Sequence, residues 1–473
     1  MAKSSPDPEL GLPIKLAPVS NGEFVPVARP ELAAVARRAR ADIEANARRA
    51  GVSRRELLAG ACGAAATLAA MNQLGCGGGN YRVPKNAGVD PAVARAALGG
   101  SELVFDVQTH HVNPSRDWFK INRAFDFLRV TWSECRRPDW IECYGQDAFI
   151  KEIFLDSDTD VAVLSALAGD DTINPLLIDE ARATRDAAEK LGERLLIHGI
   201  VTPNLGVERQ LDWMQALSEK HRVSAFKLYT VWGPGGTGWW LDDEKLGIPV
   251  IEKARALKLP RIAVHKGIPL PGMDPTYTRP RDVGVVAKRF PDVKFLIYHS
   301  GYEHRLTEGP YDPKAEAGVD ALIRSLKENG IGANANVYAE LGATWQALMG
   351  KPDEAAHVLG KLLVHVGEDR VLWGTDCIWF GSPQDQIQAF RAFEISPEFQ
   401  EKFGYPALTS ERKAKILGLN GAAVYGLDAA KLGRVRRDDL GDAKRAYAER
   451  PSPSHVAYGP RTRREVFELL RRG

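Results

Sequence analysis

The sequence is short of cysteine, of net charge and of long hydrophobic runs. Five cysteines are too few for a disulfide scaffold in a chain of 473 residues. None of them forms a CxxC pair, which argues against a structural zinc site. Lys and Arg number 63 and Asp and Glu 61, so a net charge of +2 gives no field that recruits nucleic acid. Hydrophobic residues make up 44% of the 473 residues, an ordinary share for a globular protein. What remains is a nearly neutral enzyme or binding protein.

An arginine pair precedes a short uncharged segment near the N-terminus. Arg54 and Arg55 are followed by residues 59–74, which are rich in Ala and Gly. This pattern resembles a twin-arginine signal and predicts export to the periplasm, with the twin-arginine translocation machinery as a partner. The alternative is an Ala-rich helix beside an exposed arginine pair in a cytoplasmic protein. We therefore expect an extension over residues 1–56 and a hydrophobic signal segment over 57–80.

From residue 100 onward, short apolar runs alternate with stretches long enough for a helix, such as 175–191, 207–220, 249–257 and 318–329. This alternation predicts a (β/α)8 TIM barrel, an α/β fold, over residues 100–428. A doubly wound sheet is the rival, but no GxGxxG follows an early strand. Residues 429–473 read as a charged tail that ends in a short amphipathic helix over 464–472. The eight predicted strands are 103–110, 160–166, 194–201, 223–229, 261–265, 294–299, 331–340 and 370–376.

Several of these runs end in residues that bind metals or move protons. Three of the ten histidines, His110, His265 and His299, end strands, and Asp376 ends the last one. Gln108 shares a face with His110 because side chains alternate along a strand. One strand-end histidine alone is more often packed than ligating. Four such side chains expected at the carboxyl rim of one barrel favour a catalytic metal site instead.

The order and spacing of five segments resemble a known family. The chain is similar, over residues 104–428, to the amidohydrolase superfamily, in particular to the branch that includes the aminocarboxymuconate-semialdehyde decarboxylases. The segments are FLDSDTD at 154–160, AVHKG at 263–267, FPD at 290–292 with YHSG at 298–301, LWGTD at 372–376 and ILGLNGAAVYG at 416–426.

The resemblance implies a barrel that holds one or two divalent metal ions, often zinc. By position it assigns His265 and Asp376 as ligands and His299 as a catalytic or second metal position. The first strand of the family supplies His-x-His, whereas this chain has Gln108-x-His110. An amide oxygen is a weaker donor to zinc than imidazole and suits harder cations. We expect Zn²⁺, with Mn²⁺ or Fe²⁺ as alternatives, at reduced affinity.

Three further residues are expected near a small-molecule substrate. Lys227 lies near the end of the fourth run and is either structural or substrate-facing, because the departure at Gln108 argues against a two-metal site. Glu340 ends the seventh run and either contacts substrate or caps the next helix. Trp232 belongs to an aromatic, Gly-rich loop that either closes over a flat molecule or packs on the barrel.

Three functions follow from these residues. The first is a metal-dependent hydrolase acting on a small carbonyl-containing, aromatic or carboxylated substrate, in which Asp376 takes the proton of a metal-activated water and His299 stabilises the oxyanion. The second is a non-oxidative decarboxylase with the same site, in which His299 or Asp376 protonates carbon. The third is an exported binding protein without turnover. A homo-oligomer is compatible with each.

Overall fold

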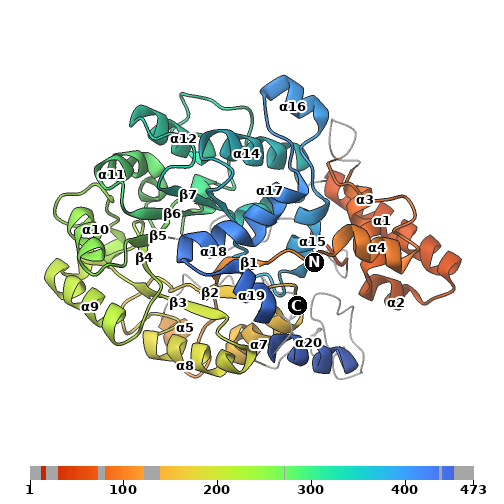
Figure 1. Cartoon of the computed structure of the whole chain (residues 1–473), viewed down its shortest axis with the longest axis horizontal. Coiled ribbons are helices and arrows are strands. Elements are labelled where there is room, and N and C mark those ends of the chain that lie inside the picture. Colours follow the sequence, from red (N-terminus) through yellow and green to blue (C-terminus); the bar gives the residue numbers. More distant parts are fainter. Residues whose placement is uncertain are drawn as a thin grey trace, which may run out of the picture.

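Eight parallel strands, paired in sequence order, form the centre of the computed structural model (Figure 1). The first and last strands meet where the amide of Val107 donates to the carbonyl of Trp373 (3.0 Å) and where Thr109 bridges Cys377. The predicted (β/α)8 barrel is therefore confirmed. The structure describes residues 12–16, 30–72, 80–121, 139–270, 272–435 and 439–451. The strands are β1 (Phe105–Thr109), β2 (Val161–Leu164), β3 (Leu195–Ile200), β4 (Ala225–Tyr229), β5 (Arg261–His265), β6 (Lys294–Tyr298), β7 (Val337–Glu340) and β8 (Val371–Leu372).

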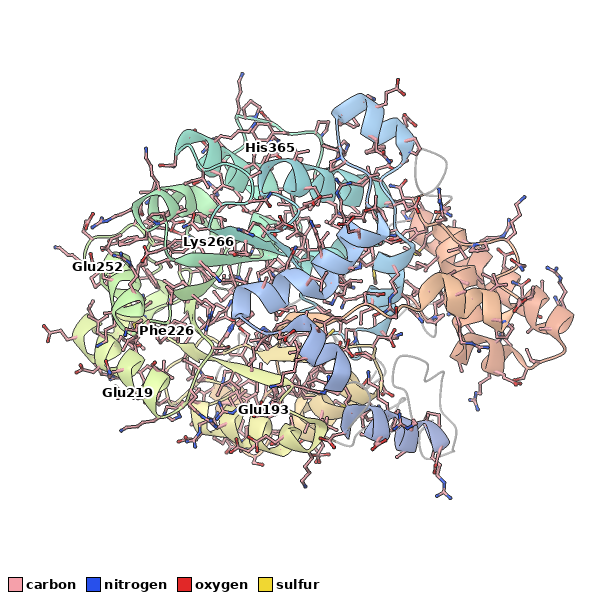
Figure 2. All side chains as sticks on the ribbon, viewed as in Figure 1. Glu193, Glu219, Phe226, Glu252, Lys266 and His365 are labelled. Carbon is pink, nitrogen blue, oxygen red and sulfur yellow. The ribbon has the colours of Figure 1, made fainter. Side chains whose placement is uncertain are left out.

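The strands are apolar along most of their length because both of their faces are covered. Side chains fill the barrel inside and helices pack outside, so no strand needs a polar face for water. Figure 2 shows Phe226 of β4 within the barrel wall, whereas Glu219 and Glu252 stand on the outer helices.

The two strands that fall furthest short of their predicted lengths are β7 and β8. Only Val337–Glu340 of the run 331–340 is strand, because Asn334 turns the backbone with a φ of 61°. Only Val371–Leu372 of the run 370–376 is strand, because the chain then leaves the sheet and reaches a φ of 60° at Asp376. The carboxyl end of β8 is thus an irregular segment that carries a site residue.

The predicted helices form the outer layer with boundaries within a few residues of expectation. Helices expected at 175–191, 207–220, 249–257 and 318–329 are α8, α9, α10 and α12. The helices after β1 are α5 (Trp118–Ile121), α7 (Gln146–Ile150), α8 (Ile178–Ala188), α9 (Val207–Glu219), α10 (Gly247–Ala256), α11 (Val283–Arg289), α12 (Gly318–Glu328), α13 (Thr344–Leu348), α14 (Pro352–His365), α15 (Gln384–Ala392), α16 (Pro397–Phe403), α17 (Ser410–Ala414), α18 (Asn420–Tyr425), α19 (Ala429–Val435) and α20 (Asp439–Glu449).

Helix α18 closes the amino end of the barrel. Its Tyr425 packs on Phe105 at the start of β1, and its hydroxyl lies 2.8 Å from Nε2 of His198 inside the barrel. The carboxyl end is therefore the end at which a substrate site can form.

Among the described residues, four helices precede the barrel: α1 (Pro30–Ala50), α2 (Arg54–Ala59), α3 (Ala61–Met71) and α4 (Pro91–Leu98). The described part of the predicted signal segment lies in α2 and α3, and α3 is buried against α1, α4 and α15. Arg54 and Arg55 are exposed at the start of α2, where the side chain of Ser53 accepts from the amide of Glu56 (3.1 Å). Within the described residues, no helix combines the length and hydropathy that a membrane crossing requires. Residues 73–79 and the predicted tail helix at 464–472 lie outside the described residues.

Candidate active site

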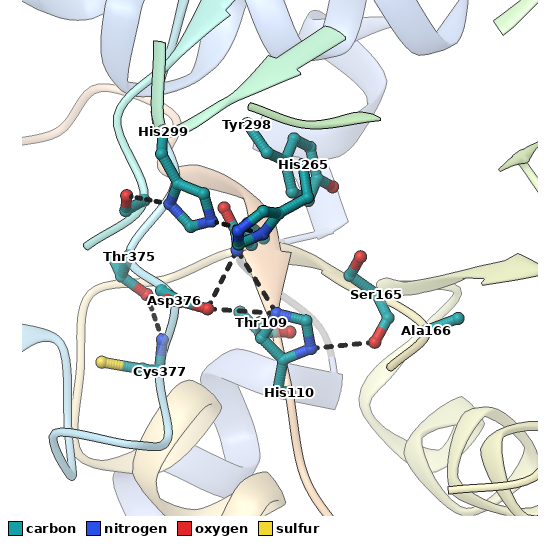
Figure 3. A network of polar contacts seen from close by, with 12 residues as sticks. Thr109, His110, Ser165, Ala166, His265, Tyr298, His299, Thr375, Asp376 and Cys377 are labelled. Atoms are coloured by element: carbon teal, nitrogen blue, oxygen red, sulfur yellow. Dashed lines mark hydrogen bonds and ion pairs between the residues drawn. The ribbon is translucent and has the colours of Figure 1, made fainter. Parts of the chain in front are cut away.

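The strand-end residues predicted from sequence come together at the carboxyl rim of the barrel (Figure 3). Gln108 and His110 lie at the end of β1, His265 is the last residue of β5, His299 directly follows β6 and Asp376 follows β8. Their contacts form two pairs, one around Asp376 and one between His265 and His299. All five residues are buried, and the side chain of Asp376 is 12% exposed.

The first pair joins His110 to Asp376. Nε2 of His110 lies 3.1 Å from Oδ1 of Asp376, and the side-chain amide of Gln108 donates to the same oxygen at 2.9 Å. Nδ1 of His110 lies 2.9 Å from the carbonyl of Ser165 and must carry the ring proton to donate to it. The lone pair on Nε2 therefore faces the carboxylate, an arrangement that suits a cation between them.

The second pair brings two imidazoles together edge to face, with ring centres 4.5 Å apart and an interplanar angle of 72°. Nδ1 of His265 and Nε2 of His299 are 3.1 Å apart. Nε2 of His265 lies 2.7 Å from the carbonyl of Ile268, and Nδ1 of His299 lies 2.8 Å from that of Gly342. Each ring thus donates to a backbone oxygen from its far nitrogen and leaves its lone pair in the site.

Burial keeps these imidazoles neutral. It lowers the pKa of His265 to about 3, and it lowers the pKa of His299 well below its ordinary value. Two neutral rings whose lone pairs face each other at 3.1 Å repel unless a positive centre lies near both. The donor set of imidazole lone pairs and a carboxylate therefore fits a divalent cation. In the described part of the chain, no three His, Cys, Asp or Glu side chains are placed so that they could hold a metal ion together as they stand.

Asp106, which sequence reasoning missed, fixes the junction of β1 and β8. Its carboxylate accepts from the hydroxyl of Thr375 (2.5 Å), the amide of Thr375 (3.1 Å) and the amide of Gln108 (3.1 Å). Burial raises the pKa of Asp106 to about 7. The sequence signal was present, since Asp106 alternates with Gln108 and His110 along β1.

Lys227 and Glu340 are both fully buried beside the cluster. Nζ of Lys227 lies 3.6 Å from the ring centre of Tyr298, and Glu340 accepts from the amides of His299 (3.1 Å) and Gly342 (2.6 Å). Burial lowers the pKa of Lys227 well below its usual value, and the charge of Glu340 opposes that shift. Burial raises the pKa of Glu340 well above its own usual value, and the amides of His299 and Gly342 oppose that shift. Glu340 holds the backbone of His299, so its contacts are those of a positioning residue.

Aromatic side chains stack on one histidine of each pair. Trp379 stacks on His110 with ring centres 5.3 Å apart and an interplanar angle of 11°, and Tyr229 stacks on His265 at 5.1 Å and 25°. Trp232 lies in an apolar cluster with Tyr229 and Ala168 rather than in contact with the histidines. The rings that stack on His110 and His265 are thus Trp379 and Tyr229 rather than Trp232, the loop residue predicted from sequence.

Comparison with known proteins gives one family and a set of barrel structures. The model of a family described as "Amidohydrolase" matches residues 166–427. An uncharacterised TIM-barrel protein from Bordetella bronchiseptica is 15% identical, with a TM-score of 0.45, over 67% of this chain and 99% of that one. A 2,6-dihydroxybenzoate decarboxylase from Rhizobium is 15% identical (TM-score 0.41, 69% and 99%). A 5-carboxyvanillate decarboxylase from Novosphingobium aromaticivorans, with bound manganese, is 13% identical (TM-score 0.41, 70% and 99%). No curated protein matches the chain.

Proposed function

Because the chain belongs to the amidohydrolase family, we propose that it is a metal-dependent enzyme that decarboxylates a small, flat aromatic or unsaturated acid without an oxidant. The single observation that carries this proposal is the burial of the acid–base cluster between aromatic rings. His110 and His265 are at most 4% exposed, and each has an aromatic ring stacked on it. A carboxylate loses solvation free energy in such a site, and its loss as carbon dioxide relieves that cost.

The cation would be held by His110, His265 and Asp376, with Gln108 beside them. Three protein ligands leave an open position for substrate, the usual arrangement of a catalytic site. A divalent cation bound there polarises a carboxylate or carbonyl oxygen. The amide oxygen of Gln108 favours a harder ion than zinc, so Mn²⁺ becomes the first ion to test, followed by Zn²⁺ and Fe²⁺.

The residues of the chain supply orientation and the proton. Trp379 and Tyr229, whose rings stack on His110 and His265, give the site apolar walls suited to a flat substrate ring. When the bond to the carboxyl carbon breaks, its electron pair stays on the ring carbon and carbon dioxide leaves. We assign the proton delivered to that carbon to Asp376 in its acid form, because its side chain is 12% exposed and can exchange a proton with water. His299 keeps its proton on Nδ1, where Gly342 accepts it, and serves to hold the cluster.

The test combines metal content with carbon dioxide release. Purified full-length protein, loaded with Mn²⁺ or Zn²⁺, is offered a panel of aromatic and unsaturated carboxylic acids. We expect about one ion per chain and release of carbon dioxide from some of these acids. His110→Ala and His265→Ala should lose the metal, whereas Asp376→Asn should lower kcat at least a hundredfold. Protein that binds no divalent ion under any loading condition would overturn the proposal.

Hydrolysis is the second candidate, and the exposure of Asp376 favours it. A partly exposed carboxylate beside a cation site can take a proton from water as readily as it can give one to carbon. A panel of amides, lactones and esters in water labelled with ¹⁸O separates the two reactions. Label in the product acid, without carbon dioxide, would replace decarboxylation by hydrolysis. Tight binding of panel compounds without any turnover would instead support the non-catalytic binding protein.

A further inference from the structure

The side-chain amide of Gln108 lies against two electron-pair donors of the cation site. Its nitrogen donates to Oδ1 of Asp376 at 2.9 Å and lies 3.4 Å from Nε2 of His110. Nδ1 of the same ring donates to the carbonyl of Ser165, so in the neutral ring Nε2 presents its lone pair to the site. The amide hydrogens of Gln108 therefore meet the same carboxylate and lone pair that a divalent cation would join.

The oxygen of the same amide, by contrast, has no hydrogen-bond donor beside it among the described residues. Oε1 of Gln108 is buried and makes no hydrogen bond with any described residue. It borders the backbone of Gly342 together with Glu340, since a Cβ placed on Gly342 would lie 2.3 Å from Oε1 of Gln108 and 2.6 Å from Oε1 of Glu340. An acceptor without a donor, close to a carboxylate, costs free energy in the barrel interior.

We propose that the amide of Gln108 makes a half-turn about its last side-chain bond when a divalent cation binds. The proposal rests on the proposed function, because it concerns the same cation. The turn brings the neutral oxygen to the cation beside His110 and Asp376 and points the NH₂ group toward Glu340. The two ends of the amide are nearly equal in size, so the turn needs little extra space. Without a cation, the NH₂ group of Gln108 thus contacts the donors of the cation site. With a cation bound, the oxygen of Gln108 is a ligand.

The proposal predicts how residue 108 sets the preference among metals. A neutral amide oxygen is a hard, weak donor, and an imidazole is a strong donor to zinc. We expect Gln108→His to raise the ratio of Zn²⁺ affinity to Mn²⁺ affinity at least tenfold. Gln108→Glu places a second carboxylate beside Asp376, so it should bind both ions more tightly than the native protein.

The test measures binding rather than turnover. Full-length protein stripped with a chelator is titrated with Mn²⁺ in competition with a fluorescent chelator. Gln108→Leu should weaken binding about tenfold or more, whereas Gln386→Leu should leave it unchanged. Gln386 is a matched control because it is also a buried glutamine with an unpartnered Oε1, located on α15 outside the cluster. Gln108→Glu keeps the test decisive if Gln108→Leu does not fold.

A spectroscopic readout reports the turn itself. In protein labelled with ¹⁵N-glutamine, the side-chain NH₂ signals of Gln108 are assigned by their loss in Gln108→Glu. We expect them to shift on addition of diamagnetic Zn²⁺, while those of Gln386 stay in place. Unchanged signals together with native Mn²⁺ affinity in Gln108→Leu would overturn the amide turn and leave the metal enzyme standing. Native protein that binds neither ion would overturn both.

Discussion

At the scale of single residues, the chemistry of this rim depends on which nitrogen of each imidazole faces inward. His110, His265 and His299 each donate from one ring nitrogen to a backbone carbonyl, and those carbonyls belong to Ser165, Ile268 and Gly342. The carbonyls fix the ring orientation and leave three lone pairs in the site, as partners of metal-binding histidines do. The residue types indicated a metal site, and these carbonyl contacts explain why the rings suit one.

The neighbouring His111 provides a pH prediction outside the site. Its Nε2 lies 2.8 Å from the hydroxyl of Thr184, and burial lowers its pKa to about 4. The unfolded chain, with a histidine pKa near 6.5, binds more protons in this window, so stability is complete above about pH 6.5 and falls as the pH drops toward 4. When the pH falls from 7.5 to 5, the free energy of unfolding of the His111→Gln variant should decrease by about 2 kcal/mol less than that of the native protein. Urea unfolding at both pH values checks this, and equal losses would refute it.

At the scale of elements, backbone hydrogen bonds join the loop after β5 to the loop after β6. The amide of Ile268 donates to the carbonyl of Tyr302 (2.6 Å), and the amide of Gly301 donates to that of Lys266 (2.9 Å). Gly267 makes this approach possible with a φ of 96°. Because His265 and His299 end the two strands that feed these loops, the loop contact sets the 3.1 Å distance between their nitrogens.

Gly267→Ala should therefore damage both stability and metal binding. A Cβ there would lie 2.6 Å from the backbone of Gly301 and from the carbonyl oxygen of Tyr302, besides its unfavourable φ. We expect a loss of about 3 kcal/mol or more in the free energy of unfolding, and weaker Mn²⁺ binding. Gly206→Ala is the matched control, since Gly206 has a φ of 114° but open space around it, and it should cost only about 1–2 kcal/mol. Chemical denaturation and metal titration compare the pair, and similar effects of both changes would contradict the close approach.

At the scale of the whole molecule, the N-terminal helices are joined to the barrel by the segment after α3. Tyr81 bridges Phe393 in antiparallel fashion, and its hydroxyl donates to the carbonyl of Met349 (2.5 Å). Next to it, Asn80 donates from its side chain to the carbonyl of Pro352 (3.1 Å). The export prediction concerns α2 and α3, whose sequence fits a translocation segment. In the structure, the apolar side chains of α3 pack against α1, α4 and α15.

Two variants separate export from packing. Arg54→Lys with Arg55→Lys changes two exposed side chains and should leave the melting temperature within about 2 °C of native. If the pair is an export signal, the same double variant should stay in the cytoplasm while the native protein reaches the periplasm. Leu68→Asp buries a carboxylate within α3 and should lower the melting temperature strongly. Native protein found only in the cytoplasm, with an intact N-terminus, would contradict the export prediction.

The sequence by itself determined the barrel and the residue types at its rim. Apolar runs alternating with helical stretches are local patterns, and a parallel strand leaves its polar residues at its carboxyl end in every barrel. His110, His265, His299 and Asp376 could therefore be selected without coordinates. The same local reasoning could separate His110 from His111, because neighbouring residues of a strand face opposite ways.

Only the tertiary structure decided how those residues meet. The distance between His265 and His299, the carbonyl partner of each ring and the unpartnered oxygen of Gln108 depend on loops that are far apart in the sequence. The stacking of Trp379 on His110 and the burial of Lys227 depend on the same assembly. Sequence patterns record the periodicity of one segment at a time, whereas lone pairs, burial and stacking arise when several segments close around one point.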